Sequence, residues 1–352
     1  MTRLFKGCLL VALVSLALAA KAQPDVDGHP DSYKFYLIPP DTDDWTRHFH
    51  VGGFAAFNIK GSFKMDGNFN SSGNDVAKGI FDNGYVRPDK TGSSDGLTSF
   101  WGYNSQTQVS GQDLILSATT GYKTDGPVHG NADAGVSPGF DMSYGANYWY
   151  WKHARVGWEL GFNLLPISIK NTQKFTVNAN QSTYTFHTGN AFLPTEPYQG
   201  GDSGSGILIR DNNFNVSSNS SSASVTGTHS LDAIVYSVRL GPTFDWDLGS
   251  HVDMQLGAGP VVGVVDGEYS FDETVTVGDV ASHNRGSFSS VGVQYGGYAN
   301  ATFNVHINQS VDFYLGAQYV MMNNYNISSG GRSANLDLGG QILVSAGINW
   351  PF

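Results

Sequence analysis

The end of the chain carries the clearest alternation of apolar and polar positions. Counting back from residue 352, every second position is apolar except Gly340, and the positions between are mostly polar or small. Because side chains alternate across a strand with a period of two, residues 336–352 are predicted to form a strand with one apolar face. About 9–11 residues cross a bilayer in a tilted strand. A lone strand would leave its backbone groups unpaired in lipid, so this pattern implies a closed barrel.

The same alternation recurs along the chain. In residues 154–164, Trp158, Leu160 and Phe162 share one face. In residues 48–60 the alternation is imperfect, because Phe54 lies on the polar face. The further predicted strands are residues 48–60, 140–151, 232–246, 252–264, 291–305 and 311–321. Short and much longer connections alternate, which is typical of barrels with periplasmic turns and extracellular loops. The prediction is an all-β fold, namely a closed antiparallel up-and-down transmembrane β-barrel of eight strands.

The two longest predicted loops, residues 61–139 and 171–230, contain short apolar stretches. Residues 97–103 and 113–119 fit a hairpin above the membrane, or an additional pair of wall strands that would give ten. Comparable stretches in the second loop would raise the count to twelve if they also entered the wall. Both alternatives stay open at the level of the sequence.

The C-terminal segment resembles the last strand of bacterial outer-membrane β-barrels, and the whole pattern resembles the small OmpA/OmpX-type barrels. The resemblance rests on alternate residues at the end of the chain, Phe352, Trp350, Ile348, Ala346 and Val344. In that family the terminal aromatic belongs to the signal read by the barrel-assembly machinery. The resemblance therefore implies this machinery as a partner, together with outer-membrane lipids and lipopolysaccharide. Pro351 departs from the pattern by removing a backbone donor, which a strand end tolerates.

The start of the chain has the features of a cleaved export signal. Arg3 and Lys6 form a positive head, an apolar run follows, and the sequence Ala20-Lys21-Ala22 fits the cleavage pattern. The expected organisation is a signal peptide at 1–22, a polar periplasmic tail at 23–47 and a transmembrane barrel domain at 48–352. An exported barrel of this kind is expected in the outer membrane of a Gram-negative-type bacterium.

Composition is compatible with a barrel exposed at the cell surface. Charged residues make up only 14% of the chain, and Gly and aromatic residues are abundant, as expected where alternate strand residues face lipid and the loops are polar. Cys8, the only cysteine, lies in the predicted signal, so cleavage leaves no thiol for disulfides or catalysis. The formal net charge of −11 argues against nucleic acid as a partner.

Several charged residues fall on the predicted inward face. An eight-stranded barrel is just wide enough for side chains to fill it, and an unpaired buried charge is costly. We therefore expect these residues to pair and plug the lumen, with an ion path as the alternative. The expected lumen charge network consists of Lys60, Arg155, Glu159, Arg239, Asp253, Asp312 and Asp337.

The sequence contains no phosphate-binding loop, no HExxH motif, no nucleophile elbow and no metal-type spacing of histidines. No catalytic residue, cofactor or metal is therefore expected. A Ser/His site near the outer rim would need the residue types found at His187, His229, Ser230, Asp232 and His283. These residues keep open the hypothesis of a barrel enzyme that modifies lipid A.

Three functions follow, in order of preference. The first is a structural, surface-recognition or adhesion role through the long extracellular loops, whose ligand is unknown. The second is a porin-like barrel of ten to twelve strands that passes small or apolar solutes. The third is the lipid-modifying enzyme. Trp101 and Tyr103 are considered as exposed ligand contacts in the first loop, although packing within that loop is favoured for them.

Overall fold

The structure is a computed structural model that describes most of the chain from Arg47 onward. The described residues are 47–70, 74–151, 154–189, 191–249, 251–308 and 311–351. The predicted signal peptide, the tail up to residue 46, and Phe352 lie outside them. No helix among these residues has the length and apolar character needed to cross a membrane.

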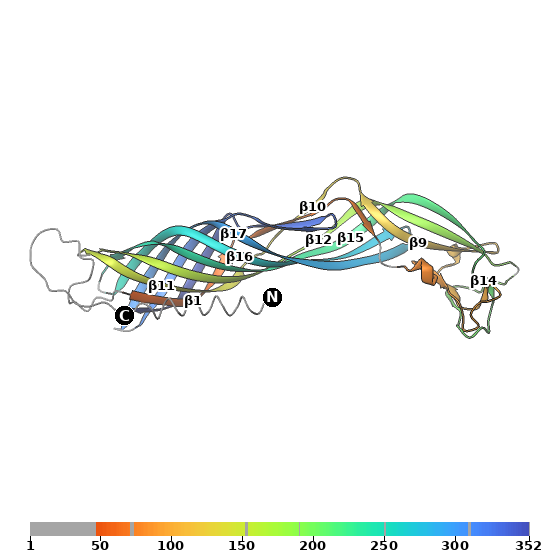
Figure 1. The fold of residues 1–352 in the computed structure, drawn as a ribbon, viewed down its shortest axis with the longest axis horizontal. Helices are drawn as coiled ribbons and strands as arrows, with labels where there is room; N and C mark the ends of the chain where they lie inside the picture. Colours follow the sequence, from red (N-terminus) through yellow and green to blue (C-terminus); the bar gives the residue numbers. More distant parts are fainter. Residues whose placement is uncertain are drawn as a thin grey trace, which may run out of the picture. The chain divides into compact units, whose positions relative to one another are not determined.

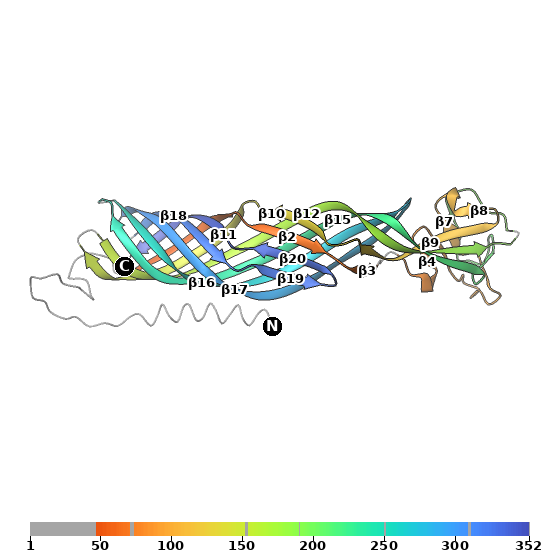
Figure 2. The ribbon, with the colours of Figure 1, turned by 90° about the horizontal axis from the view of Figure 1, so that it is seen from above.

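Antiparallel pairing closes a ring of strands (Figure 1, Figure 2). β1 (Arg47–Phe57) pairs with β21 (Gln341–Pro351) on one side and with β11 (Ser137–Trp151) on the other. From β11 the ring continues through β12 (Ala154–His187), β15 (Phe214–Asp247), β16 (Val252–Val277), β17 (Val280–Asn308) and β18 (Val311–Met322), and back to β21. The ring of described residues contains these eight strands and no open edge. The predicted closed antiparallel barrel is confirmed.

Several ring strands continue well beyond the lengths predicted from the sequence. β12 and β15 pair without a register shift from Ala154 opposite Trp246 to Phe186 opposite Phe214. In this outer part, β9 (Asp113–Thr124) pairs with β12, and two short strands, β3 (Asn68–Asn70) and β8 (Val109–Ser110), pair with β9. Residues 113–119 therefore extend the sheet above the ring and do not enter the wall.

A second sheet lies over the outer parts of the ring strands. Its order is β10 (Val128–Asp133), β2 (Lys60–Met65), β20 (Arg332–Asp337) and β19 (Tyr325–Ser329). This sheet shares one buried core with the outer parts of β12, β15 and β16, which contains Phe63, Ile169, Tyr269, Tyr325 and Leu336. We call this sheet together with the outer parts of β12 and β15–β17 the extension.

Residues 74–108 and 191–211 form a small unit, which we call the head, and its core includes Leu114 and Leu116 of β9 and Phe186 of β12. It contains the 3-10 helices η1 (Val76–Lys78) and η2 (Gln106–Gln108) and the short strands β4 (Ile80–Phe81), β5 (Gly84–Val86), β6 (Leu97–Thr98), β7 (Trp101–Tyr103), β13 (Tyr198–Gln199) and β14 (Ile209–Arg210). Trp101 and Tyr103 are 0% and 1% exposed in its core. The idea that they are exposed ligand contacts is wrong, and the packing interpretation holds.

The ring strands change their apolar face along their length. In β15, the outward residues Leu240 and Phe244 are exposed, and the inward Arg239 is buried. Toward lower residue numbers the pattern inverts, because Leu231 and Val235 are buried inside. Ile234 is the last apolar residue of the outward belt, and the outward positions from Asp232 back to Ser218 are polar. Apolar residues outside suit lipid and apolar residues inside suit water, so the inversion marks where the strand leaves the membrane.

Exposed aromatic residues flank the outward apolar belt at both ends. Near the short turns the belt ends with Trp149, Trp151, Trp246 and Trp350, and toward the extension with Phe57, Phe140, Tyr295 and Tyr319. Aromatic girdles at both interfaces are typical of membrane-spanning barrels. The lipid-facing surface predicted from the sequence is therefore present in the ring.

Candidate functional site in the barrel lumen

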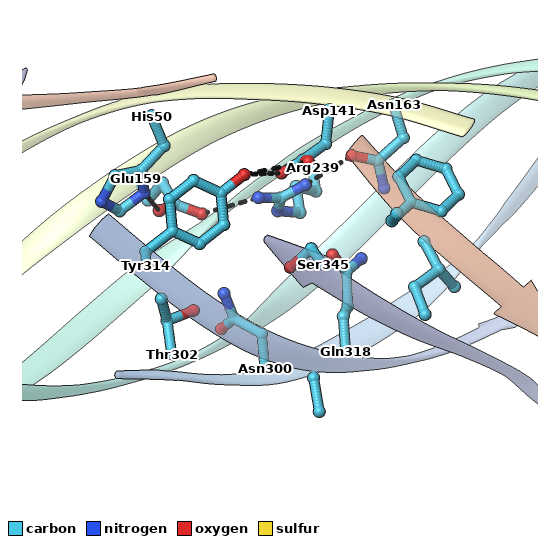
Figure 3. A pocket seen from close by; sticks show the side chains of 13 residues that line it. His50, Asp141, Glu159, Asn163, Arg239, Asn300, Thr302, Tyr314, Gln318 and Ser345 are labelled. Carbon is cyan, nitrogen blue, oxygen red and sulfur yellow. Dashed lines mark hydrogen bonds and ion pairs between the residues drawn. The ribbon is translucent and has the colours of Figure 1, made fainter. Parts of the chain in front are cut away.

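Glu159 lies at the centre of a buried polar cluster (Figure 3). Its Oε1 accepts a hydrogen bond from Arg239 Nη2 at 3.0 Å, and Arg239 Nη1 donates to Asn163 Oδ1 at 2.7 Å. Its Oε2 lies 3.6 Å from His50 Nδ1 and 4.0 Å from His48 Nε2. All of these side chains are buried. The arrangement joins one carboxylate, one guanidinium and two imidazoles in the interior of the ring.

The register of three neighbouring strands brings His48 and Glu159 together. His48 lies opposite Gly145 of β11, and Gly145 lies opposite Glu159 of β12. Gly145 carries no side chain, and a Cβ at this position would overlap the His48 ring. Gly161 gives room to Arg239 in the same way. The glycines on the inward face therefore make space for the long polar side chains of their neighbours.

Tyr314 and Asp141 extend the cluster across the lumen. The Tyr314 hydroxyl donates to Asp141 Oδ1 at 3.0 Å, and the Tyr314 ring lies with its centroid 5.0 Å from that of His50. The cavity between these residues has a volume of only ≈ 10 Å³, about the space that one water requires. Side chains therefore fill this level of the lumen.

A second polar cluster lies nearer the short turns. Arg155 Nη2 is 2.8 Å from Asp247 Oδ1 and 3.3 Å from Asp253 Oδ2. His306 lies 3.5 Å from Asp253 and 3.0 Å from Asp312. The adjoining cavity of ≈ 30 Å³ has space for about two waters.

The structure places most of the expected lumen charge network inside the ring, but in two groups. Glu159 pairs with Arg239, whereas Arg155 pairs with Asp253. Arg155 and Glu159, four residues apart on one face, thus have different partners. Asp312 belongs to the second group through His306.

Lys60 and Asp337 are exposed and lie opposite each other on β2 and β20, outside the lumen. The alternation that placed them inside is interrupted in both cases. Asn58 has a φ of 62°, and after it the buried positions change from even to odd numbers. Residues 339 and 340 form a turn that has the same effect before β21. The prediction that Lys60 and Asp337 belong to the lumen charge network is therefore wrong.

The C-terminal residues Trp350, Ile348, Ala346 and Val344 all lie on the outward face of β21, with Ile348 and Val344 exposed. Their proposed role in assembly stays a prediction, and Phe352 lies outside the described residues. Leu336 and Leu338, by contrast, are buried inside the extension. The single long strand predicted for residues 336–352 is therefore two strands with opposite phases.

Sequence reasoning missed His48 and His50 as members of the site. The spacings that identify helical or loop metal sites do not include His-x-His. On a strand, however, residues two apart point to the same side, so this pattern in the first strand was the available signal. Tyr314, on the inward face of β18, was missed because an aromatic residue there resembles ordinary core packing.

The residues considered for a lipid-modifying enzyme are held by different partners. His187 Nδ1 lies 2.7 Å from Asp113 Oδ1, and His283 Nδ1 lies 3.1 Å from the Thr274 hydroxyl. The others make separate contacts or lie at the surface: His229 bonds to Tyr269, Ser230 bonds to Ser270, and Asp232 is exposed.

The extension contains a further buried ion pair. Arg332 Nη2 lies 2.6 Å from Glu273 Oε2, and the Arg332 guanidinium lies 4.2 Å and 3.9 Å from the ring centroids of Phe69 and Phe271. The Tyr122 hydroxyl donates to the same carboxylate, and burial raises the pKa of Tyr122. Burial also lowers the pKa of His229, whose Nε2 is 3.9 Å from Glu273. These contacts hold β20, β9 and β16 together above the membrane.

A closed antiparallel ring with an apolar exterior, aromatic girdles and a polar interior defines an integral outer-membrane β-barrel, and this chain is such a protein. It matches no protein-family model and no curated protein in sequence. It is similar in fold to several solved structures of outer-membrane proteins, with low TM-scores. They include the outer membrane protease OmpT from Escherichia coli, with 10% identity, 89% of this chain and 99% of that chain covered, and a TM-score of 0.32.

Two others are the outer membrane protein OprG from Pseudomonas aeruginosa and Ail, the attachment invasion locus protein of Yersinia pestis. OprG has 8% identity, coverage of 89% of this chain and 99% of its own, and a TM-score of 0.28. Ail has 10% identity, coverage of 85% and 98%, and a TM-score of 0.22. No statement about activity follows from likenesses at this level.

Proposed function

We propose that the protein is a closed outer-membrane anchor that presents the head at the cell surface for recognition or adhesion. The observation that carries the proposal is the uninterrupted pairing of β12 and β15, which extends from the short turn to Phe186 opposite Phe214. Only the part of β12 up to Leu164 has its apolar residues outward. The part of β12 beyond Leu164 is therefore not needed to span a bilayer, and its far end lies at the head.

The part of β12 beyond Leu164 is long enough to reach past the lipid surface. At about 3.3 Å per residue, this part of the strand has a contour length of roughly 75 Å. It carries a buried core on its inner side and polar residues such as Thr172, Lys174 and Asn178 on its outer side. Such a sheet is suited to water and holds its end away from the membrane.

The head is a packed unit and not a set of loose loops. Trp101 Nε1 donates to the Ile207 carbonyl at 2.7 Å, and Asp89 accepts hydrogen bonds from the backbone of Thr91 and of Ser99, both at 3.0 Å. The bond from Trp101 to Ile207 joins the two chain segments that form the head, and the bonds to Asp89 fix the first segment internally. A surface held in one conformation binds with less loss of entropy than a mobile loop, which favours recognition.

The lumen supports an anchor and not a channel. The Glu159–Arg239 pair, Tyr314 and Asp141 cross the interior. The two cavities beside the lumen clusters have space for only about one and two waters. The core of the extension closes the space above them with apolar side chains such as Phe54 and Leu343. The solute-channel hypothesis would require these groups to move together.

The test compares the full protein with a headless variant. Asn-Gly turns replace residues 71–120 and 180–220, because Asn70 lies opposite Gly121 and Ala179 lies opposite Ser221. Both proteins are folded in detergent and applied to an array of glycans and extracellular-matrix proteins. We expect the full protein to bind and the headless barrel to fold but not bind.

Planar-bilayer recording is the second arm of the test. The folded full-length protein is expected to give no discrete conductance steps. Equal array binding by the headless barrel, or regular channel openings of the full protein, would reject the anchor proposal.

A further inference from the structure

We propose that His48, His50 and Glu159 form a binding site inside the barrel for one divalent transition-metal ion of the zinc class, a property beyond the recognition role. One potential ligand atom from each residue lies within 4.8 Å of the others, and all three residues are buried. Glu159 Oε2 is the common point, because both imidazoles approach it.

The spacing of these atoms fits a metal ion after small movements. Zinc binds imidazole nitrogens at about 2.0–2.1 Å and carboxylate oxygens at about 2.0–2.2 Å, so neighbouring ligand atoms in a tetrahedron are separated by roughly 3.4 Å. His50 Nδ1 and His48 Nε2 lie 3.6 Å and 4.0 Å from Glu159 Oε2. Relative to Glu159 Oε2, the two nitrogens need to approach by only a few tenths of an ångström, and all three ligand atoms lie within 4.8 Å of one another.

The donor set selects the kind of ion. Two imidazoles and one carboxylate suit zinc and its neighbours in the first transition series, whereas calcium and magnesium prefer oxygen ligands alone. The surroundings are also acidic, since buried carboxylates outnumber buried guanidinium groups in the two lumen clusters. The buried carboxylates are Asp141, Glu159, Asp245, Asp253 and Asp312, whereas Arg239 is the buried guanidinium group and Arg47 and Arg155 are partly buried. This excess offsets the charge of a bound cation.

Unpartnered polar atoms beside the cluster give an independent reason to expect a ligand. His50 Nε2 and Gln255 Oε1 are buried without a hydrogen-bond partner. The Gln255 amide lies 3.3 Å from His48 Nε2 and lines the same cavity. Rotation of this amide would direct its oxygen toward the three ligands, where it supplies a fourth donor.

The neighbouring residues already hold the ligands in place. Arg239 occupies Glu159 Oε1 and leaves Oε2 directed at the imidazoles. The Ser143 hydroxyl lies 3.2 Å from His50 Nδ1 and is the hydrogen-bond partner that an ion at this nitrogen would displace. Gly145 provides the space in which His48 and Glu159 meet. Hydrogen-bonded supporting groups of this kind raise metal affinity by orienting the ligands.

A bound ion would connect strands that do not pair directly. His48 and His50 lie on β1, which closes the ring against β21, and Glu159 lies on β12 beyond β11. The ion would therefore link β1 to β12 past the intervening β11, close to the β1–β21 pairing that closes the ring. Because the unfolded chain does not hold these residues together, binding is expected to raise the unfolding temperature.

The test uses the full-length mature chain without an affinity tag, folded in detergent and stripped with a chelator. Calorimetric titration with Zn²⁺ is expected to show one ion per chain, and Ca²⁺ is expected not to bind. Co²⁺ serves as a spectroscopic substitute, with visible absorption bands of four-coordinate geometry expected. His50→Ala is expected to weaken Zn²⁺ binding by at least about a hundredfold, because loss of a ligand exceeds the loss of a supporting group.

The matched control is His306→Ala, which removes a histidine of the same lumen outside the cluster. It is expected to leave Zn²⁺ affinity within about threefold. Absence of Zn²⁺ binding by the unmodified protein, or equal loss in both variants, would overturn the proposal. Should His50→Ala fail to fold, the Zn²⁺ stoichiometry and Co²⁺ spectrum of the unmodified protein decide the question.

Discussion

Glu159 on β12 and Arg239 on β15 meet inside the barrel with 3.0 Å between Oε1 and Nη2, and only 1% and 5% of the two residues is exposed. Arg239 lies opposite Gly161, two residues from Glu159 on the same face. The pair thus links neighbouring ring strands diagonally and occupies the lumen. Neither charge has access to bulk water as a substitute partner.

Removal of Arg239 is expected to destabilise the barrel strongly. Arg239→Ala leaves the Glu159 carboxylate buried and unpaired, which costs about 3–5 kcal/mol. Urea unfolding in lipid vesicles, followed by tryptophan fluorescence, measures the loss. Arg285→Ala, at an exposed position opposite Asp272, should cost less than about 1 kcal/mol. Equal losses in the two variants would show that the lumen pair is not a structural element.

The boundary of the lipid-facing surface can be tested on a single strand. Leu240→Arg places a charge on the outward face of β15 within the apolar belt, at an expected cost of about 2–4 kcal/mol. Thr226→Arg makes the same change on the outward face of the extension, where we expect an effect within about 0.5 kcal/mol. Folding yield and unfolding free energy in vesicles distinguish the two. A large penalty at residue 226 would place that face in lipid.

The extension is expected to lose stability as the pH falls. Burial lowers the pKa of His229 below its ordinary value of 6.5, so below that pH the unfolded chain takes up a proton that the folded chain does not. Stability therefore decreases below about pH 6.5, by at most about 1.4 kcal/mol per pH unit from this group.

Denaturant titrations between pH 8 and pH 5.5 measure this slope. His229→Gln should flatten the slope because it removes the proton uptake, while the glutamine amide can still bond to Tyr269. His129→Gln, at an exposed position of β10, should leave the slope unchanged. A slope that persists in full in His229→Gln would assign the pH dependence to other groups.

Disruption of the head is expected to leave the barrel intact. Trp101→Ala removes a fully buried side chain and its hydrogen bond to Ile207, which costs about 3–5 kcal/mol of local stability. Limited proteolysis should then cut within residues 74–108 while the barrel keeps its heat-modifiable migration on gels. Phe192→Ala, which is 80% exposed in the unmodified chain, should not increase cleavage. Unfolding of the whole protein by Trp101→Ala would mean that the head and barrel fold as one cooperative unit.

Phe54 lies on the face of the first strand where polar residues are predicted. It breaks the apolar alternation of the first strand, but it is buried in the core that lies above the polar part of the lumen. A deviation from the membrane pattern therefore marked the start of a different environment. Leu165 also marks this change of environment, because it is buried inside although the adjacent Leu164 faces lipid.

The continuation of the strands above the membrane could not be predicted from periodicity. In residues 171–187 and 214–230, polar residues such as Thr172 and Ser224 alternate with small residues such as Ala179 and Ala223. This weak pattern is also found in polar loops. Pairing of the two segments with each other, with β9 and with β16 makes them strands.

The sequence by itself determined that the chain forms a closed membrane barrel, because period-two alternation and the need to pair every backbone group in lipid are local requirements. Tertiary structure alone decided the phase of each strand, the partners of each lumen charge and the position of the head. A shift such as the one at Asn58 reverses every later side chain, and only contacts with neighbouring strands select it. The meeting of His48 with Glu159 across Gly145 likewise depends on the register of β11 and β12 with β1, which lies far from both in the chain.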